Sequence, residues 1–127
     1  MERTIVSTES APKAIGPYSQ ANTVGNMVFT SGQIPLDPQT MEIPTQDVQE
    51  QTKLVLENLK AVVEAAGSSM DNVIKVTVFI KNMDDFGKIN EVYGEYFADN
   101  PPARSCVEVA RLPKDVQVEM EAIALIK

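Results

Sequence analysis

The last quarter of the chain, from Pro101 to Ile126, constrains the fold most strongly. Polar and apolar residues alternate with a period of two along the runs Ser105–Ala110 and Val116–Ile126, and five residues connect the two runs. This period is typical of β-strands with two unlike faces, because successive side chains point to opposite sides of a sheet. The end of the chain therefore predicts two strands.

The same alternation groups the charged residues by face. Arg104, Cys106 and Glu108 share one side of the first strand, and Glu119 and Glu121 share one side of the second. These side chains could all be structural or solvated, since a strand arginine is commonly part of an ion pair. They could equally line a cleft that holds an anionic ligand. The pattern leaves both interpretations open.

Two amphipathic helices and one strong strand precede this region. Apolar residues recur at steps of three and four from Thr45 to Ala66, and again in a helix that we expect to begin at an Asp84 cap. The apolar stripe of this second helix consists of Phe86, Ile89, Tyr93, Tyr96 and Phe97. Between them, Val73–Lys81 predicts a strand with two distinct faces. One face is expected to carry Ile74, Val76, Val78 and Ile80, and the other Lys75, Thr77 and Phe79.

The first third of the chain predicts three further strands. These are Thr4–Ser7 and the pair Ala21–Val24 and Met27–Ile34, which a Gly-Asn turn connects as a hairpin. A turn at residues 37–40 follows, with Met41–Ile43 as a short extension after it.

This order of elements predicts a single α+β domain over residues 1–127, with one mixed sheet and both helices on one face. Each helix has one apolar stripe, so the other face of the sheet would remain uncovered. We expect that face to carry Thr77, Phe79, Cys106 and Ile123, which are too apolar for water. Self-association would cover it, and closed symmetry is the usual solution.

The composition excludes several kinds of chemistry. The chain has no histidine, which is the commonest general base and metal ligand, and it has a single cysteine. We therefore expect no metal, no organic cofactor and no disulfide. A net charge of −7 without a basic cluster argues against a nucleic-acid partner. The apolar runs are too short for a membrane span or a secretory signal, and we expect a cytoplasmic protein.

Two loop positions could contribute to a site. Tyr18 follows a stiff Gly-Pro turn, where it could either pack the loop or face a ligand. Gly32 interrupts an apolar strand, and a glycine there usually marks a bulge or the close approach of another group.

Four blocks of the sequence carry a resemblance to a known family. They are IGPYSQA (Ile15–Ala21), TSGQIPLDP (Thr30–Pro38), VTVFIKNMDDFGKINEVYGEYF (Val76–Phe97) and PPARSCVEVARLPKDVQVEMEAIA (Pro101–Ala124). With these blocks the chain resembles the Rid (reactive intermediate deaminase) family, formerly YjgF, and its RidA-type members in particular. The resemblance implies a chorismate-mutase-like fold and a homotrimer with clefts between subunits. It also implies hydrolysis of 2-iminopropanoate and 2-iminobutanoate to 2-oxo acids and ammonia.

The resemblance further implies roles for seven residues. Arg104 would bind the substrate carboxylate, and the other positions associated with the cleft are Tyr18, Ser31, Gly32, Asn90, Cys106 and Glu119. The chemistry of these side chains agrees, because a guanidinium pairs with a carboxylate through two parallel hydrogen bonds. Glu119 could position the water and move its proton to the departing nitrogen, with Tyr18 orienting the substrate. We expect Cys106 to have a packing role, although a thiol beside an arginine could also be a nucleophile.

Two other classes of function remain open. The trimer could bind small carboxylates as a regulatory or holdase-type protein without turnover. Members of the family have also been linked to translation inhibition and RNA cleavage, which the absence of histidine and the net charge of −7 disfavour here.

Overall fold

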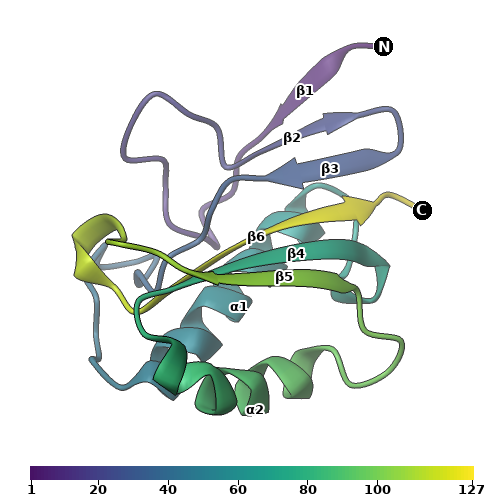
Figure 1. Ribbon diagram of the computed structural model, residues 1–127. Coiled ribbons are helices and arrows are strands. Elements are labelled where there is room, and N and C mark those ends of the chain that lie inside the picture. Colours follow the sequence, from purple (N-terminus) through teal and green to yellow (C-terminus); the bar gives the residue numbers. More distant parts are fainter.

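Six strands form one mixed sheet in the computed structural model, which describes residues 1–127 (Figure 1). The strand order is β1-β2-β3-β6-β4-β5, and every neighbouring pair is antiparallel except β4 and β5. The strands are β1 (Arg3–Val6), β2 (Ala21–Val24), β3 (Met27–Thr30), β4 (Val73–Ile80), β5 (Ala103–Glu108) and β6 (Val118–Leu125). The helices are α1 (Val48–Ala65) and α2 (Phe86–Tyr96).

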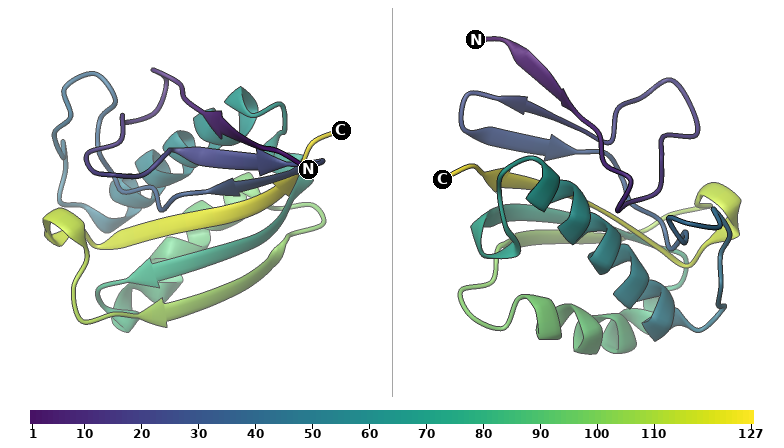
Figure 2. Two further views of the ribbon diagram at one scale, coloured as in Figure 1. Left: turned by 90° about the horizontal axis from the view of Figure 1, so that it is seen from above. Right: turned by 180° about the vertical axis from the view of Figure 1, so that it is seen from behind.

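Both helices lie side by side on one face of the sheet (Figure 2), so the predicted α+β architecture is confirmed. The main core lies between the helices and the strands and contains side chains from both. On the opposite face, Phe29 is 41% exposed and Val107 on β5 is 44% exposed. No helix in the structure is both long enough and apolar enough to cross a membrane.

Three local predictions were wrong. Helix α1 begins at Val48 and not near Thr45, because the Asp47 side chain accepts a hydrogen bond from the Glu50 N–H and caps the helix there. Asp84 does not cap α2, since a short 3₁₀ turn, Met83–Asp85, precedes the helix. The strand predicted over Met27–Ile34 ends at Thr30, and beyond it Gln33 makes only an isolated bridge to Met120.

Strand β4 shows the predicted alternation with one exception. Val76, Val78 and Ile80 are buried beneath the helices. Ile74 was predicted to share their face, but it is 41% exposed. The register with β6 shifts between Val73 and Lys75, which places one extra residue in β4 and turns Ile74 outward.

The expected position of Cys106 was also wrong. Cys106 pairs in register with Val78, so its side chain lies on the helix side of the sheet and packs against the main core. The alternation within β5 was read correctly. It could not indicate which face was the buried one, because that depends on the pairing with β4.

Asn58 connects α1 to the segment after β3. Its side chain is 2% exposed, and its amide donates to the carbonyl oxygens of Ile34 at 3.1 Å and Leu36 at 2.9 Å. Two buried backbone carbonyls that belong to no regular element are satisfied in this way.

We expect Asn58→Ala to lower the free energy of unfolding by about 2–4 kcal/mol, because both carbonyls would lose their partner inside the protein. Urea denaturation would measure the loss. Lys53→Ala is a matched control on the exposed face of the same helix, and its effect should stay within about 0.5 kcal/mol. Equal effects of the two changes would contradict the role of Asn58.

Candidate active site

The site residues form two groups in the structure. Glu119 and Gly32 lie at the centre of the first group. Glu119 lies on β6 opposite Phe79 of β4, on the face of the sheet that the helices do not cover. A Cβ atom placed on Gly32 would lie 2.1 Å from Glu119 Oε2. Two backbone hydrogen bonds between Gln33 and Met120 hold the segment of Gly32 against β6. Position 32 therefore has no side chain because the carboxylate fills that space.

Tyr18 and Ser31 belong to the same group. The Ser31 hydroxyl donates to the Ser19 carbonyl at 2.6 Å, which ties the loop of Tyr18 to the end of β3. The Tyr18 hydroxyl accepts from the Ile15 N–H at 3.3 Å. The group opens into a cavity of about 410 Å³, lined by Ile15, Tyr18, Ser31, Gly32, Ile34, Pro113, Glu119 and Glu121.

The environment of Glu119 favours its protonated form. Burial raises the pKa of this half-buried carboxyl, and the negative charge of Glu121 raises it further. A carboxyl with a raised pKa can accept a proton from water and return it more readily near neutral pH than an exposed glutamate can. This is the property that an acid–base catalyst without histidine requires.

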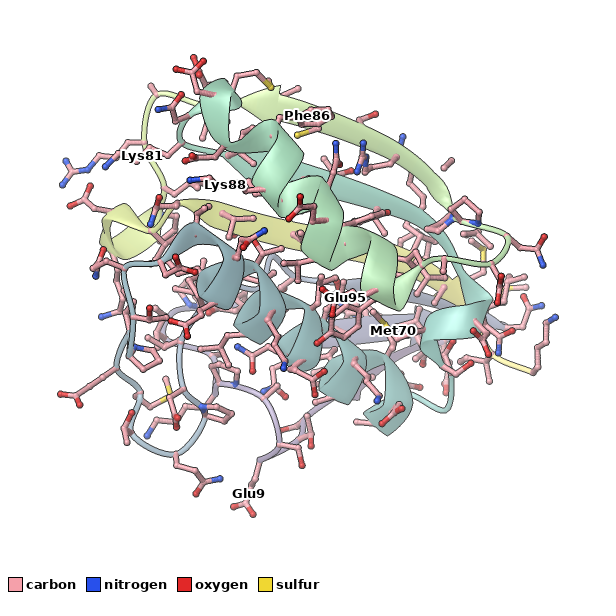
Figure 3. The ribbon with its side chains drawn as sticks, turned by 90° about the horizontal axis from the view of Figure 1, so that it is seen from below. Glu9, Met70, Lys81, Phe86, Lys88 and Glu95 are labelled. Carbon is pink, nitrogen blue, oxygen red and sulfur yellow. The ribbon has the colours of Figure 1, made fainter.

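Arg104 is the centre of the second group. It lies on β5, at the edge of the sheet above α2, and its Nη1 donates to Asn90 Oδ1 at 2.7 Å. Its guanidinium carbon lies 5.3 Å from the centre of the Phe86 ring and 4.8 Å from that of Tyr93. Figure 3 shows Phe86 at the start of α2, on the side toward β5.

Cys106 is next to Arg104 on the same side of β5. Burial raises the pKa of the Cys106 thiol, and the positive charge of Arg104 only partly opposes this rise. The thiol is therefore protonated at neutral pH, which fits the expected packing role and not that of a nucleophile.

The two groups lie on opposite faces of one sheet. Arg104 pairs with Val76 of β4, and Glu119 pairs with Phe79, three residues further along the same strand. Side chains three residues apart in a strand point to opposite faces. Within one chain, the structure thus brings together Tyr18, Ser31, Gly32 and Glu119, and separately Asn90, Arg104 and Cys106. It does not join the two groups.

The sequence analysis did not predict that the rings of Phe86 and Tyr93 contact Arg104. Both were read as members of the apolar stripe of α2. The available signal was their spacing with Asn90 at positions i, i+4 and i+7, which puts one amide and two rings on a single helix face.

Comparison with known proteins identifies the family. The family model described as Endoribonuclease L-PSP matches residues 8–126. The chain belongs to the L-PSP/YjgF family. One relative is TdcF of Escherichia coli K12, which is provisionally named a reactive intermediate deaminase. It is 59% identical to this chain over 124 residues, which cover 95% of each chain. The 2-iminobutanoate/2-iminopropanoate deaminase of the same organism is 53% identical over 128 residues, 98% of each chain.

Solved structures agree with this membership. A crystal structure of E. coli TdcF with bound serine matches with a TM-score of 0.93 at 57% identity and covers 98% of this chain and 99% of that one. A Thermotoga maritima protein, provisionally described as an endoribonuclease, matches with a TM-score of 0.96 at 57% identity, with coverage of 100% and 99%. The chain thus has the L-PSP fold over its whole length.

We expect the stability effect of Glu119→Gln to depend on pH. Because the pKa of Glu119 is raised in the folded protein, the folded state binds this proton more tightly than the unfolded chain does, and stability falls as pH rises through the raised pKa. Glutamine carries no charge, so the variant should melt at a higher temperature than the wild type near pH 7. Below about pH 4, where Glu119 is protonated in both states, the difference should vanish.

Thermal melts at several pH values would measure this effect. Glu9→Gln is a matched control, since Glu9 is an exposed loop residue (Figure 3) and the change should shift the melting temperature little at any pH. A Glu119→Gln protein that melts below the wild type near neutral pH would contradict the desolvation argument.

Proposed function

We infer that the protein hydrolyses 2-imino acids, such as 2-iminopropanoate and 2-iminobutanoate, to 2-oxo acids and ammonia. Close relatives named as deaminases support this class of reaction. The observation that carries the proposal is the state of Arg104, whose guanidinium is fixed in place while it has no carboxylate partner in the chain. The single ion pair of the chain joins Arg111 and Asp115.

Arg104 provides the binding step. Of its five N–H donors, one is used by Asn90 Oδ1, so others remain for a bidentate pair with the substrate carboxylate. Such a pair fixes the plane of a small imino acid and therefore the direction from which its C=N carbon can be attacked. The bound serine in the TdcF structure is also a small α-carboxylate, which agrees with a ligand of this class.

Glu119 provides the proton transfers. As a base it takes a proton from a water molecule while the water oxygen bonds to the imine carbon. As an acid it returns that proton to the nitrogen, which gives a carbinolamine. It then takes the proton of the carbinolamine hydroxyl and passes it to the nitrogen, so that the C–N bond breaks, ammonia leaves and the C=O bond of the 2-oxo acid forms. The raised pKa of Glu119 suits both steps. The Tyr18 hydroxyl, at the same cavity, is available to donate a hydrogen bond to the substrate.

A site that uses both groups needs two copies of the chain. Arg104 and Glu119 lie on opposite faces of the sheet, so the arginine of one copy would complete the cavity of a neighbour. A head-to-tail contact of this kind forms a ring when its rotation closes. We propose a homotrimer with three equivalent clefts, in which the exposed apolar face with Phe29 and Val107 is covered. The expected independence of cofactors and the cytoplasmic location remain predictions.

The serine bound to TdcF also favours a second candidate, a carboxylate-binding protein without turnover. Steady-state ammonia release from freshly generated 2-iminopropanoate separates the two candidates, provided that the rate is compared with uncatalysed hydrolysis. A rate equal to that background would reject the deaminase.

We expect Gly32→Ala to reduce kcat by about 10- to 100-fold with little loss of stability. The new methyl group would displace the end of the flexible Glu119 side chain and not the backbone, and a shift of about 1 Å in a catalytic group has this effect on rate. Ammonia release and melting temperature, measured on the same preparation, would test both parts. An unchanged kcat would mean that the carboxylate does not act from the position described.

Mixing two inactive variants tests the shared site. Arg104→Ala and Glu119→Gln should each lose most activity, by about 10- to 1,000-fold for the arginine. After the two are unfolded and refolded together, about a quarter of the sites in a head-to-tail ring should combine an intact arginine with an intact glutamate.

The activity of this mixture should therefore rise toward about a quarter of the wild-type activity. Light scattering should give a trimer mass. A mixture of Glu119→Gln with Gly32→Ala is the matched control, because both changes affect the same group and no intact site can form. Absence of recovery in the first mixture would mean that the site does not span two copies.

A further inference from the structure

We propose that Phe86 and Tyr93 are positioning residues, whose rings hold the Arg104 guanidinium in the plane that receives the substrate carboxylate. The two rings, with Arg104 against them, are called the aromatic clamp below. This proposal rests on the proposed function, because it concerns how the same carboxylate is bound.

The geometry of α2 makes the clamp. Phe86, Asn90 and Tyr93 are spaced i, i+4 and i+7, so one helix face presents all three to β5. The guanidinium carbon lies 5.3 Å from the centre of the Phe86 ring and 4.8 Å from that of Tyr93, within the range of cation–π contacts. Phe97 packs against Tyr93 with ring centres 4.8 Å apart, and so supports the second ring.

Aromatic rings suit this task better than carboxylates. A ring contacts the flat face of a guanidinium, whereas the N–H donors lie along its edge. Ring contacts through that face would restrict the guanidinium without using its donors, and only Asn90 takes one of them. A glutamate in place of either ring would fix Arg104 equally well, but it would neutralise the charge that binds the substrate.

The Tyr93 hydroxyl does not explain the choice of this residue. Tyr93 is 6% exposed, and its oxygen is buried without a hydrogen-bond partner in the chain. Burial of this oxygen without a partner is unfavourable for folding. The ring is thus the part that acts on Arg104.

The test compares variants that remove a ring with variants that keep it. Phe86→Leu and Tyr93→Leu retain apolar volume but offer no π face, and we expect each to raise KM for 2-iminopropanoate about three- to thirty-fold with a much smaller change in kcat. Tyr93→Phe keeps the ring, so it should restore the KM that Tyr93→Leu loses. Trimer mass and melting temperature are recorded for every variant.

Tyr96→Leu is the matched control. Tyr96 lies on the same helix, but its hydroxyl donates to Glu57 at 2.6 Å, and the cation–π contacts of Arg104 are with Phe86 and Tyr93. The same change of residue there should leave KM within about two-fold of the wild type, since the cation–π contact is untouched. If Tyr96→Leu raises KM as much as Tyr93→Leu does, the rise in KM comes from a general disturbance of α2, and the clamp is rejected.

Binding of pyruvate, measured by calorimetry, separates this proposal from the proposed function. Pyruvate carries the same carboxylate and needs no turnover. The Leu variants should raise its Kd about three- to thirty-fold, even if the wild type proves to release no ammonia above background. An unchanged pyruvate Kd in both Leu variants would overturn the clamp whatever the activity of the wild type.

Discussion

The register of β4 with its two neighbours decides which face of the sheet Arg104 and Glu119 occupy. Val76 pairs with Arg104 on one side and Phe79 pairs with Glu119 on the other, which directs guanidinium and carboxylate to opposite faces. A slip of one residue in either pairing would move Arg104 or Glu119 to the wrong face. The buried side chains of β4 prevent this, because each buried Val or Ile stabilises the fold by about 1.5–3 kcal/mol.

Stability and chemistry conflict most clearly at Glu119. A half-buried carboxyl, close to a second one and packed on a glycine backbone, is an unfavourable choice for folding alone. The well-packed core on the other face of the same strand can offset this cost, since Met120 and Val118 on either side of Glu119 are fully buried. The alternation of β6 thus separates a buried face, which stabilises the fold, from the face that carries Glu119.

Much of this could be predicted from the sequence, because strand and helix periods are local properties. The alternation around Arg104 and Glu119 correctly grouped the charged residues within each strand. The face that Cys106 occupies and the bulge that exposes Ile74 could not be predicted, since both depend on pairing between distant segments. Phe86 and Tyr93 were recognised only as apolar, because a helix pattern does not reveal what a ring contacts. The family resemblance predicted site residues that the patterns alone left open.

The separation of the two groups by the thickness of the sheet has a consequence for dilute solutions. A single copy carries every residue of the site, yet it cannot bring Arg104 and Glu119 to one substrate molecule. Catalysis that needs both would therefore follow the law of mass action for assembly, and specific activity would fall on dilution once copies separate. The concentration of the protein would then act as a control on its own chemistry, without any separate regulatory site.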